Sequence, residues 1–103
     1  MLSSKPSMKP SSILNLQRNA IHQAISQHHA TNPRIFGSVL HGDEREDSDI
    51  DLLVDILPGA TLLDLGELQV ELETLLGVSV DLLTPGDLPL RFRAQVLAEA
   101  QPI

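Results

Sequence analysis

The 103-residue chain is 42% apolar, which suits one small domain with a modest core and argues against a second folded domain. Its net charge of −7 opposes the phosphate neutralisation that nucleic-acid binding requires, and its two aromatic residues are too few for stacking along a single strand. It has no cysteine and no segment apolar enough for a membrane span or a secretory signal, so we expect a soluble, cytoplasmic protein without direct nucleic-acid contact.

The beginning of the chain divides into an arm and a helix. Residues 1–10 combine serine, lysine and proline without periodicity, which predicts a flexible N-terminal arm, and 11–103 are expected to form the single domain. Ser11 or Ser12 can cap a helix whose apolar residues recur near the helical period, and this helix is expected to end before Pro33.

Two strands separated by a charged loop are expected next. The short apolar segment 33–36 predicts a first strand that turns sharply at Gly37, followed by one helical turn at 39–41. The charged stretch 43–48 predicts a loop. The apolar run 49–55, with acids at every second position at its start, predicts a second strand.

The second half of the chain alternates between helices and a strand. Residues 61–76 carry leucines at helical spacing up to Gly77, which predicts a helix whose leucine stripe packs in the core. Residues 78–83 predict a third strand, 84–87 a turn, and 90–99 a final helix. The leucine stripe consists of Leu62, Leu65, Leu68, Leu72, Leu75 and Leu76.

This order of elements indicates the fold class. Strands that alternate with helices predict an α/β fold, with a small mixed β-sheet and helices packed against it. The connection between the first two strands is only about a dozen residues long, so that pair could run in either direction.

Two aspartates mark the start of the predicted second strand. Asp49 and Asp51 are two residues apart, so a strand places both side chains on one face, with backbones roughly 6.5–7 Å apart. Hard divalent cations such as Mg²⁺ take oxygen ligands and usually retain water and substrate phosphates in their remaining positions. The pair is therefore a candidate Mg²⁺ site that a nucleoside triphosphate would complete.

A third acid, Asp81, lies in the apolar third strand, where an ionised group is costly unless it is paired or bound to a metal ion. If this strand neighbours the second one, Asp81 joins Asp49 and Asp51. Three carboxylates can hold two metal ions, one activating an attacking hydroxyl and the other stabilising the triphosphate and the leaving pyrophosphate. Asp81 is then the candidate proton acceptor.

Gly37 and Ser38 lie where a strand ends and a helical turn begins. Backbone N–H groups at such a position can bind phosphate, and glycine permits the close approach of the phosphate. The Ser38 hydroxyl is thus a candidate donor to the β- or γ-phosphate, which would turn the α-phosphorus toward an acceptor.

The spacing of these residues resembles that of a known enzyme family. Gly37-Ser38, ten further residues and then Asp49-x-Asp51 match the signature of the polymerase-beta-like nucleotidyltransferase superfamily, with Asp81 suitably placed as its third acid. The minimal nucleotidyltransferases that are paired with HEPN-domain proteins in toxin–antitoxin modules have a segment similar to FGSVLHGDEREDSDIDLLVD. The resemblance covers nearly everything after the first helix.

The resemblance implies a fold, a reaction and a partner. The implied fold is that of the polymerase-beta-like nucleotidyltransferases, in which the acids at Asp49, Asp51 and Asp81 bind two Mg²⁺ ions, and Gly37 and Ser38 contact the ATP phosphates. The implied reaction is protein adenylylation, the transfer of AMP from ATP to a hydroxyl, that of a tyrosine, on a HEPN ribonuclease toxin. The protein would assemble with this toxin and neutralise it as an antitoxin.

At one position the chain departs from the family. Many members carry arginine where this chain has His41. His41 could itself donate to phosphate, and Arg45 in the same loop is a candidate to supply positive charge there.

Other functions and simpler structural roles stay open on the sequence alone. The same chemistry could act on a small molecule or an RNA end, and a non-catalytic antitoxin that only occludes its toxin could retain the acids as a relic. Asp49 could instead cap a strand, and Asp51 and Asp81 could lie at solvated strand positions. Arg91 and Arg93 in the final helix could face a partner or a bound nucleotide, but we expect them to be solvated.

Overall fold

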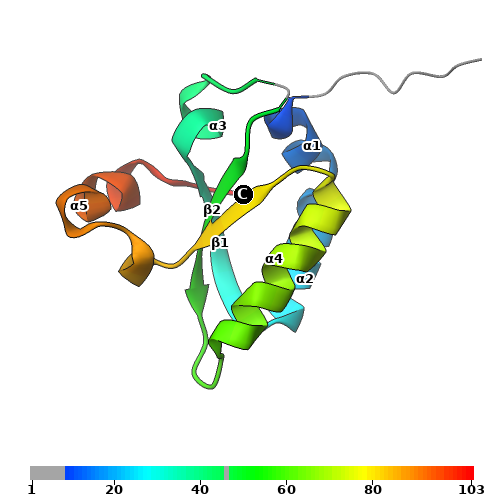
Figure 1. Cartoon of the computed structure of the whole chain (residues 1–103), viewed down its shortest axis with the longest axis vertical. Helices are drawn as coiled ribbons and strands as arrows, with labels where there is room; N and C mark the ends of the chain where they lie inside the picture. Colours follow the sequence, from blue (N-terminus) through cyan, green and yellow to red (C-terminus); the bar gives the residue numbers. More distant parts are fainter. Residues whose placement is uncertain (1–8, 46) are drawn as a thin grey trace, which may run out of the picture.

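The computed structural model describes residues 9–45 and 47–103. A sheet runs through the centre of the molecule (Figure 1). It has four strands in the order β3-β2-β1-β4. Within the described residues, no helix is long and apolar enough to cross a membrane. The elements in chain order are α1 (Pro10–Leu16), α2 (Arg18–Gln27), β1 (Ala30–Phe36), α3 (Gly37–His41), β2 (Ile50–Ile56), α4 (Leu62–Leu76), β3 (Val80–Leu83), the 3₁₀ turn η1 (Pro85–Asp87), α5 (Leu90–Glu99) and β4 (Gln101–Pro102).

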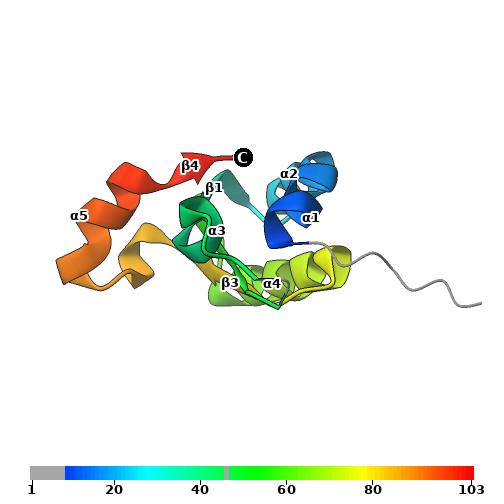
Figure 2. The same cartoon turned by 90° about the horizontal axis from the view of Figure 1, so that it is seen from above.

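The sheet is mixed, as the sequence predicted. β1 runs antiparallel to both β2 and β4, whereas β2 and β3 are parallel. A parallel pair needs a long crossover connection, and α4 supplies it between β2 and β3. Seen from above in Figure 2, α2 and α4 lie on one side of the sheet and α5 lies on the other.

β2 directs alternate side chains to the two faces of the sheet. Ile50, Leu52 and Val54 are fully buried and belong to the main core, which they form with α2 and α4. By the same alternation Asp51 points to the opposite face, on the side of α5. The two helices contribute Ile21, Ala24, Ile25, Leu68, Leu72 and Leu76 to the core.

α4 confirms the predicted long helix but not all of its core stripe. The hydroxyl of Thr61 accepts a hydrogen bond from the backbone N–H of Asp64 at the start of the helix, and Gly77, with φ of 72°, ends it. The assignment of Leu62 to the core was wrong, because its side chain is 85% exposed. The buried residues of this 15-residue helix are Leu68, Leu72 and Leu76, so its first turn lies beyond the core.

The first predicted helix is divided into α1 and α2 at Gln17, whose φ of −105° and ψ of 14° are not helical. The buried carboxylate of Glu44 accepts hydrogen bonds from the backbone N–H and the hydroxyl of Ser11, and so caps α1 from a distant loop. Local periodicity cannot indicate such a contact. Pro10, which we expected in the arm, is buried at the start of α1, and residues 1–8 of that arm lie outside the described residues.

Three of the strands differ from expectation. β1 begins at Ala30 rather than at Pro33, because a register shift between Thr31 and Arg34 accommodates the proline. β3 is shorter than predicted and begins at Val80. β4 was not predicted, since its two residues carry no alternating pattern and form a strand only by pairing with β1.

α5 matches its predicted range, but one of its arginines is not solvated. Arg93 donates hydrogen bonds to the carbonyls of Gly86 at 3.1 Å and Leu88 at 2.9 Å, so the expectation for this side chain was wrong. These bonds attach α5 to η1. The backbone carbonyls of a turn have no partner in a helix or sheet ladder, and here a side chain supplies the donor. Arg91 is exposed and lies over the ring of Phe92, with 4.9 Å between its Cζ atom and the ring centroid.

Candidate active site

A row of three paired residues crosses the sheet, and two of them are predicted site acids. Phe36 on β1 is paired with Asp51 on β2, and Asp51 is paired with Asp81 on β3. Residues paired in register direct their side chains to the same face of a sheet. The structure therefore brings Asp51 and Asp81 together from adjacent strands, as a shared site requires.

Asp51 is the most enclosed of the three predicted acids. It is half-buried, whereas Asp81 and Asp49, which lies just before β2, are exposed. Burial, together with the negative charges of Asp81 and Asp49, raises the pKa of Asp51 from 3.8 to about 6. Both neighbours are thus close enough to disfavour the ionised form of Asp51.

Gly37 brings the start of α3 against this row. Its φ of 74° is a left-handed conformation that favours glycine, and a Cβ atom here would lie 2.1 Å from Oδ2 of Asp51. No other residue fits this position unless Asp51 moves. Ser38, which is half-buried, follows as the second residue of α3. The predicted residues Gly37, Asp49 and Asp81 therefore all neighbour Asp51, and Ser38 is bonded to Gly37.

The donors at this site suit a hard cation, although the side chains do not complete a metal centre alone. Carboxylate oxygens are ligands that Mg²⁺ prefers. Among residues 9–45 and 47–103, no three acidic or histidine side chains are grouped closely enough to hold an ion by themselves. Mg²⁺ held by Asp49, Asp51 and Asp81 would therefore also need water or phosphate oxygens, which is its usual mode of binding at substrate phosphates.

The two basic candidates near α3 have different surroundings. Nε2 of His41 lies 3.4 Å from Oε2 of Glu99, so this side chain connects α3 to α5. Arg45 is exposed, and its backbone N–H donates to the hydroxyl of Ser48 at 2.7 Å. The sequence indicated neither the contact of His41 with α5 nor the hydrogen bond between Arg45 and Ser48.

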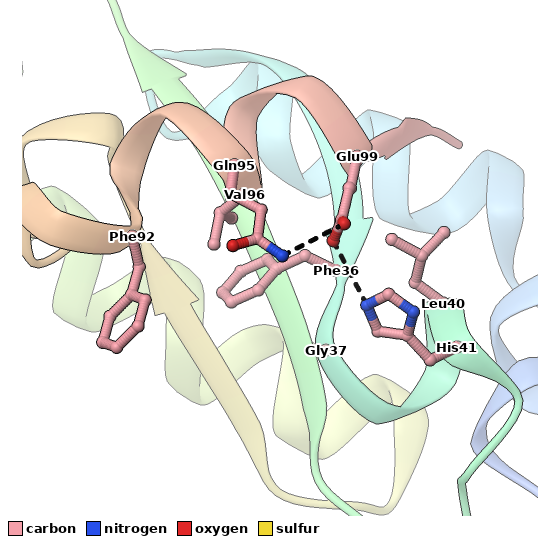
Figure 3. A pocket seen from close by; sticks show the side chains of 8 residues that line it. All are labelled: Phe36, Gly37, Leu40, His41, Phe92, Gln95, Val96 and Glu99. Carbon is pink, nitrogen blue, oxygen red and sulfur yellow. Dashed lines mark hydrogen bonds and ion pairs between the residues drawn. The ribbon is translucent and has the colours of Figure 1, made fainter.

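Beside the acidic row lies a cleft that the sequence did not reveal. It has a volume of about 310 Å³ and is formed by the end of β1, by α3 and by α5 (Figure 3). Gly37 lines the cleft and also contacts the acidic row. Phe36 and Phe92 line it too, and they are the only Phe, Tyr or Trp residues in the sequence. The two residues are far apart in the sequence, so the sequence did not show that they line one cleft. That the chain has only two aromatic residues was a signal that could have singled them out.

The fold and these residues together define a class of enzyme. A small mixed sheet that presents a Gly-Ser turn beside carboxylates from two parallel strands is the arrangement expected of a nucleotidyltransferase. The family described as "Polymerase beta, Nucleotidyltransferase" matches residues 15–103, and the chain belongs to this family.

Two archaeal relatives carry more specific names. A protein of Methanocaldococcus jannaschii, provisionally named protein adenylyltransferase MJ0435, is 37% identical over 87 residues, which cover 84% of this chain and 94% of the relative. The protein adenylyltransferase MntA of Thermococcus cleftensis is 43% identical over 65 residues, which cover 63% of this chain and 66% of the relative. These names agree with the predicted class of enzyme.

Solved structures share the fold. A provisionally identified minimal nucleotidyltransferase superposes with a TM-score of 0.83 and 44% identity, covering 96% of this chain and all of that one (100%). A toxin–antitoxin structure with AMP-PNP superposes with a TM-score of 0.68 and 23% identity, covering 82% of this chain and 69% of that one. These likenesses confirm the predicted polymerase-beta-like nucleotidyltransferase fold.

Proposed function

We propose that the protein is an adenylyltransferase that moves AMP from ATP to a hydroxyl of a partner protein. The observation that carries this proposal is the pairing of Asp51 with Asp81, with Gly37 packed against Asp51. The relatives named as protein adenylyltransferases support a protein as the acceptor.

Gly37 and Ser38 would bind the ATP phosphates. Because Gly37 has no side chain, its backbone lies close to Asp51, and a phosphate bound there would be next to the carboxylates. The Ser38 hydroxyl would donate to the β- or γ-phosphate and so orient the α-phosphorus. The AMP-PNP in a structure of the same fold supports ATP as the donor.

Asp49, Asp51 and Asp81 would hold Mg²⁺, with two ions in the complete site. When bound, Mg²⁺ supplies the positive charge that offsets the charges of the triphosphate and of the departing pyrophosphate. The three carboxylates suit this role because their mutual repulsion, which contributes to the raised pKa of Asp51, is relieved by a cation between them.

The transfer needs a proton acceptor, which we assign to Asp81. The acceptor hydroxyl gives its proton to the Asp81 carboxylate, and its oxygen forms a bond to the α-phosphorus. The bond from the α-phosphorus to the bridging oxygen breaks, and pyrophosphate leaves with the electron pair. Asp81 is exposed whereas Asp51 is half-buried, so Asp81 is the acid that a hydroxyl on a large partner can reach.

The partner would be a HEPN ribonuclease toxin that is modified on a tyrosine. The toxin–antitoxin structure of the same fold supports a toxin as the partner. Addition of AMP would neutralise the toxin, and the protein would act as its antitoxin in a complex. The reaction requires ATP and Mg²⁺, so the proposed location is the cytoplasm.

The test is to incubate the purified protein with α-labelled ATP, Mg²⁺ and the protein encoded by the neighbouring gene, and to map added mass by peptide mass spectrometry. We expect AMP on a tyrosine hydroxyl of the partner. Asp51→Ala and Asp81→Ala should each reduce labelling by about a hundredfold or more. Asp47→Ala is the matched control, because it removes the same charge from an exposed position before β2 and should label normally.

Two results would contradict the proposal. Labelling that survives both Asp51→Ala and Asp81→Ala would mean that the site is elsewhere. A stable complex without added mass would favour an antitoxin that acts by occlusion, and the transferase function would be withdrawn.

A further inference from the structure

The cleft between α3 and α5 has features that the transfer chemistry does not use. Figure 3 shows the ring of Phe36 at the end of β1 and the ring of Phe92 extending from α5. Arg91 lies over one face of the Phe92 ring, yet Phe92 is 46% exposed, so a large apolar surface in a chain with only two aromatic residues is left partly open to solvent. An exposed aromatic ring is a surface on which a flat ring can stack.

The position of the cleft restricts what could occupy it. Phe36 is the register partner of Asp51. Gly37 lines the cleft and also lies against the side chain of Asp51. The cleft therefore opens next to the residues proposed to bind the phosphates. In a nucleoside triphosphate only a ribose separates the base from the α-phosphate. If the α-phosphate of a nucleotide lies at Asp51, its base can reach only a surface next to Asp51. This cleft is such a surface.

One end of the cleft is polar. The side-chain amide of Gln95 donates to Oε1 of Glu99 at 3.3 Å, and Oε2 of Glu99 lies 3.4 Å from Nε2 of His41 (Figure 3). Glu99 thus bridges α5 and α3. An amide has two N–H groups and a carbonyl oxygen, so Gln95 keeps a donor and an acceptor for the edge of a ligand ring. The volume of about 310 Å³ is at the lower end of the roughly 300–1,000 Å³ of ligand pockets.

We propose that this cleft holds the nucleobase of the nucleotide donor, with the base stacked on Phe92 and its polar edge facing Gln95. The inference rests on the proposed function, because it takes the phosphates to lie at Gly37 and Ser38. An aromatic side chain of the acceptor protein is the competing occupant, and the experiment separates the two.

The experiment measures binding by calorimetry in the presence of Mg²⁺. The probes are an ATP analogue with a methylene group between the α- and β-phosphates, which cannot transfer AMP, and inorganic tripolyphosphate, which has no base. Phe92→Leu removes the ring but keeps an apolar side chain, whereas Phe92→Trp keeps a ring. Leu97→Ala is the control, because Leu97 is an exposed apolar residue of the same helix that does not line the cleft.

We expect Phe92→Leu to weaken binding of the ATP analogue by about tenfold or more and to leave tripolyphosphate binding unchanged. Phe92→Trp and Leu97→Ala should bind both probes as the unmodified protein does. Equal binding of the analogue by the unmodified protein and Phe92→Leu would overturn the inference, and so would an analogue that binds no more tightly than tripolyphosphate.

The acceptor alternative and the proposed function have separate readouts. If Phe92→Leu leaves analogue binding intact but raises the KM for the partner protein, the cleft holds the acceptor and the inference is wrong. If the unmodified protein binds the analogue through Phe92 but transfers no AMP to any partner, the proposed function fails while the base site stands.

Discussion

At the scale of single residues, Gly37 and Gly42 form a matched pair at the two ends of α3. Both have a positive φ, 74° and 76°, but a Cβ atom at Gly37 would meet Asp51, whereas one at Gly42 would meet nothing within 4 Å. We expect Gly37→Ala to lower the free energy of unfolding by roughly 2 kcal/mol more than Gly42→Ala does, since overpacking adds to the shared backbone strain.

The same substitution should affect the reaction. Displacement of Asp51 in Gly37→Ala is expected to reduce AMP transfer by about a hundredfold, because catalysis is sensitive to displacements of about 1 Å. Urea denaturation and the labelling assay measure the two effects. Equal stability and equal labelling in the Gly37→Ala and Gly42→Ala variants would show that Asp51 yields to the added methyl group at no cost.

Asp51 also contributes to the dependence of stability on pH in the absence of metal ions. Its pKa is raised from 3.8 to about 6, so the folded protein holds this proton more tightly than the unfolded chain does. The contribution of this group to folding is therefore fully present below about pH 4 and is lost as the pH rises through about 6.

Asp51→Asn should remove this loss. We expect the variant to be more stable than the unmodified protein at about pH 7.5, nearly equal to it at about pH 4, and inactive in AMP transfer. Urea denaturation at the two pH values, with EDTA present, measures the difference. Asp47→Asn, at an exposed position, should change neither value. A variant destabilised equally at both pH values would contradict this account of Asp51.

At the scale of elements, two hydrogen bonds from Arg93 to the carbonyls of Gly86 and Leu88 attach α5 to the turn that precedes it. Arg93→Met keeps an apolar stem but removes both donors, and we expect a loss of roughly 1.5–3 kcal/mol in stability because hydrogen bonds to a charged group are lost. Amide hydrogen exchange in α5 should become faster. Arg91→Met is the control, since Arg91 only covers the Phe92 ring. Equal rates of amide exchange in α5 of the two variants would show that Arg93 does not attach the helix.

The elements also differ in how far the sequence could predict them. α4 and α5 were predicted because their periodicity is local, and in α4 the cap residues Thr61 and Gly77 act within one turn of the helix ends. The cap of α1 was not predicted, since the carboxylate of Glu44 that accepts from Ser11 comes from a separate loop. The exposure of Leu62 was not predicted either, because periodicity assigns a helix face but not how far along the helix the core extends.

At the scale of the whole molecule, the sheet order brings together segments that are distant in the chain. The alternation of helices and strands indicated a small mixed sheet, but strand direction depends on which strands pair. The parallel pairing of β2 with β3 places Asp51 beside Asp81, and the position of α5 across from α3 creates the cleft lined by Phe36 and Phe92.

By itself, the sequence determined the class of fold and the candidate site residues Gly37, Ser38, Asp49 and Asp51, because the Gly-Ser turn and the i, i+2 spacing of the two acids are local features of short segments. Asp81 was a candidate only on the condition that its strand pairs with β2, which the tertiary structure decided. Only the tertiary structure decided that Gly37 touches Asp51, that Glu99 bridges α5 to His41, and that a cleft lies beside the acids. The physical reason is that these contacts join segments far apart in sequence, and they form only when the shared core fixes the helices against the sheet.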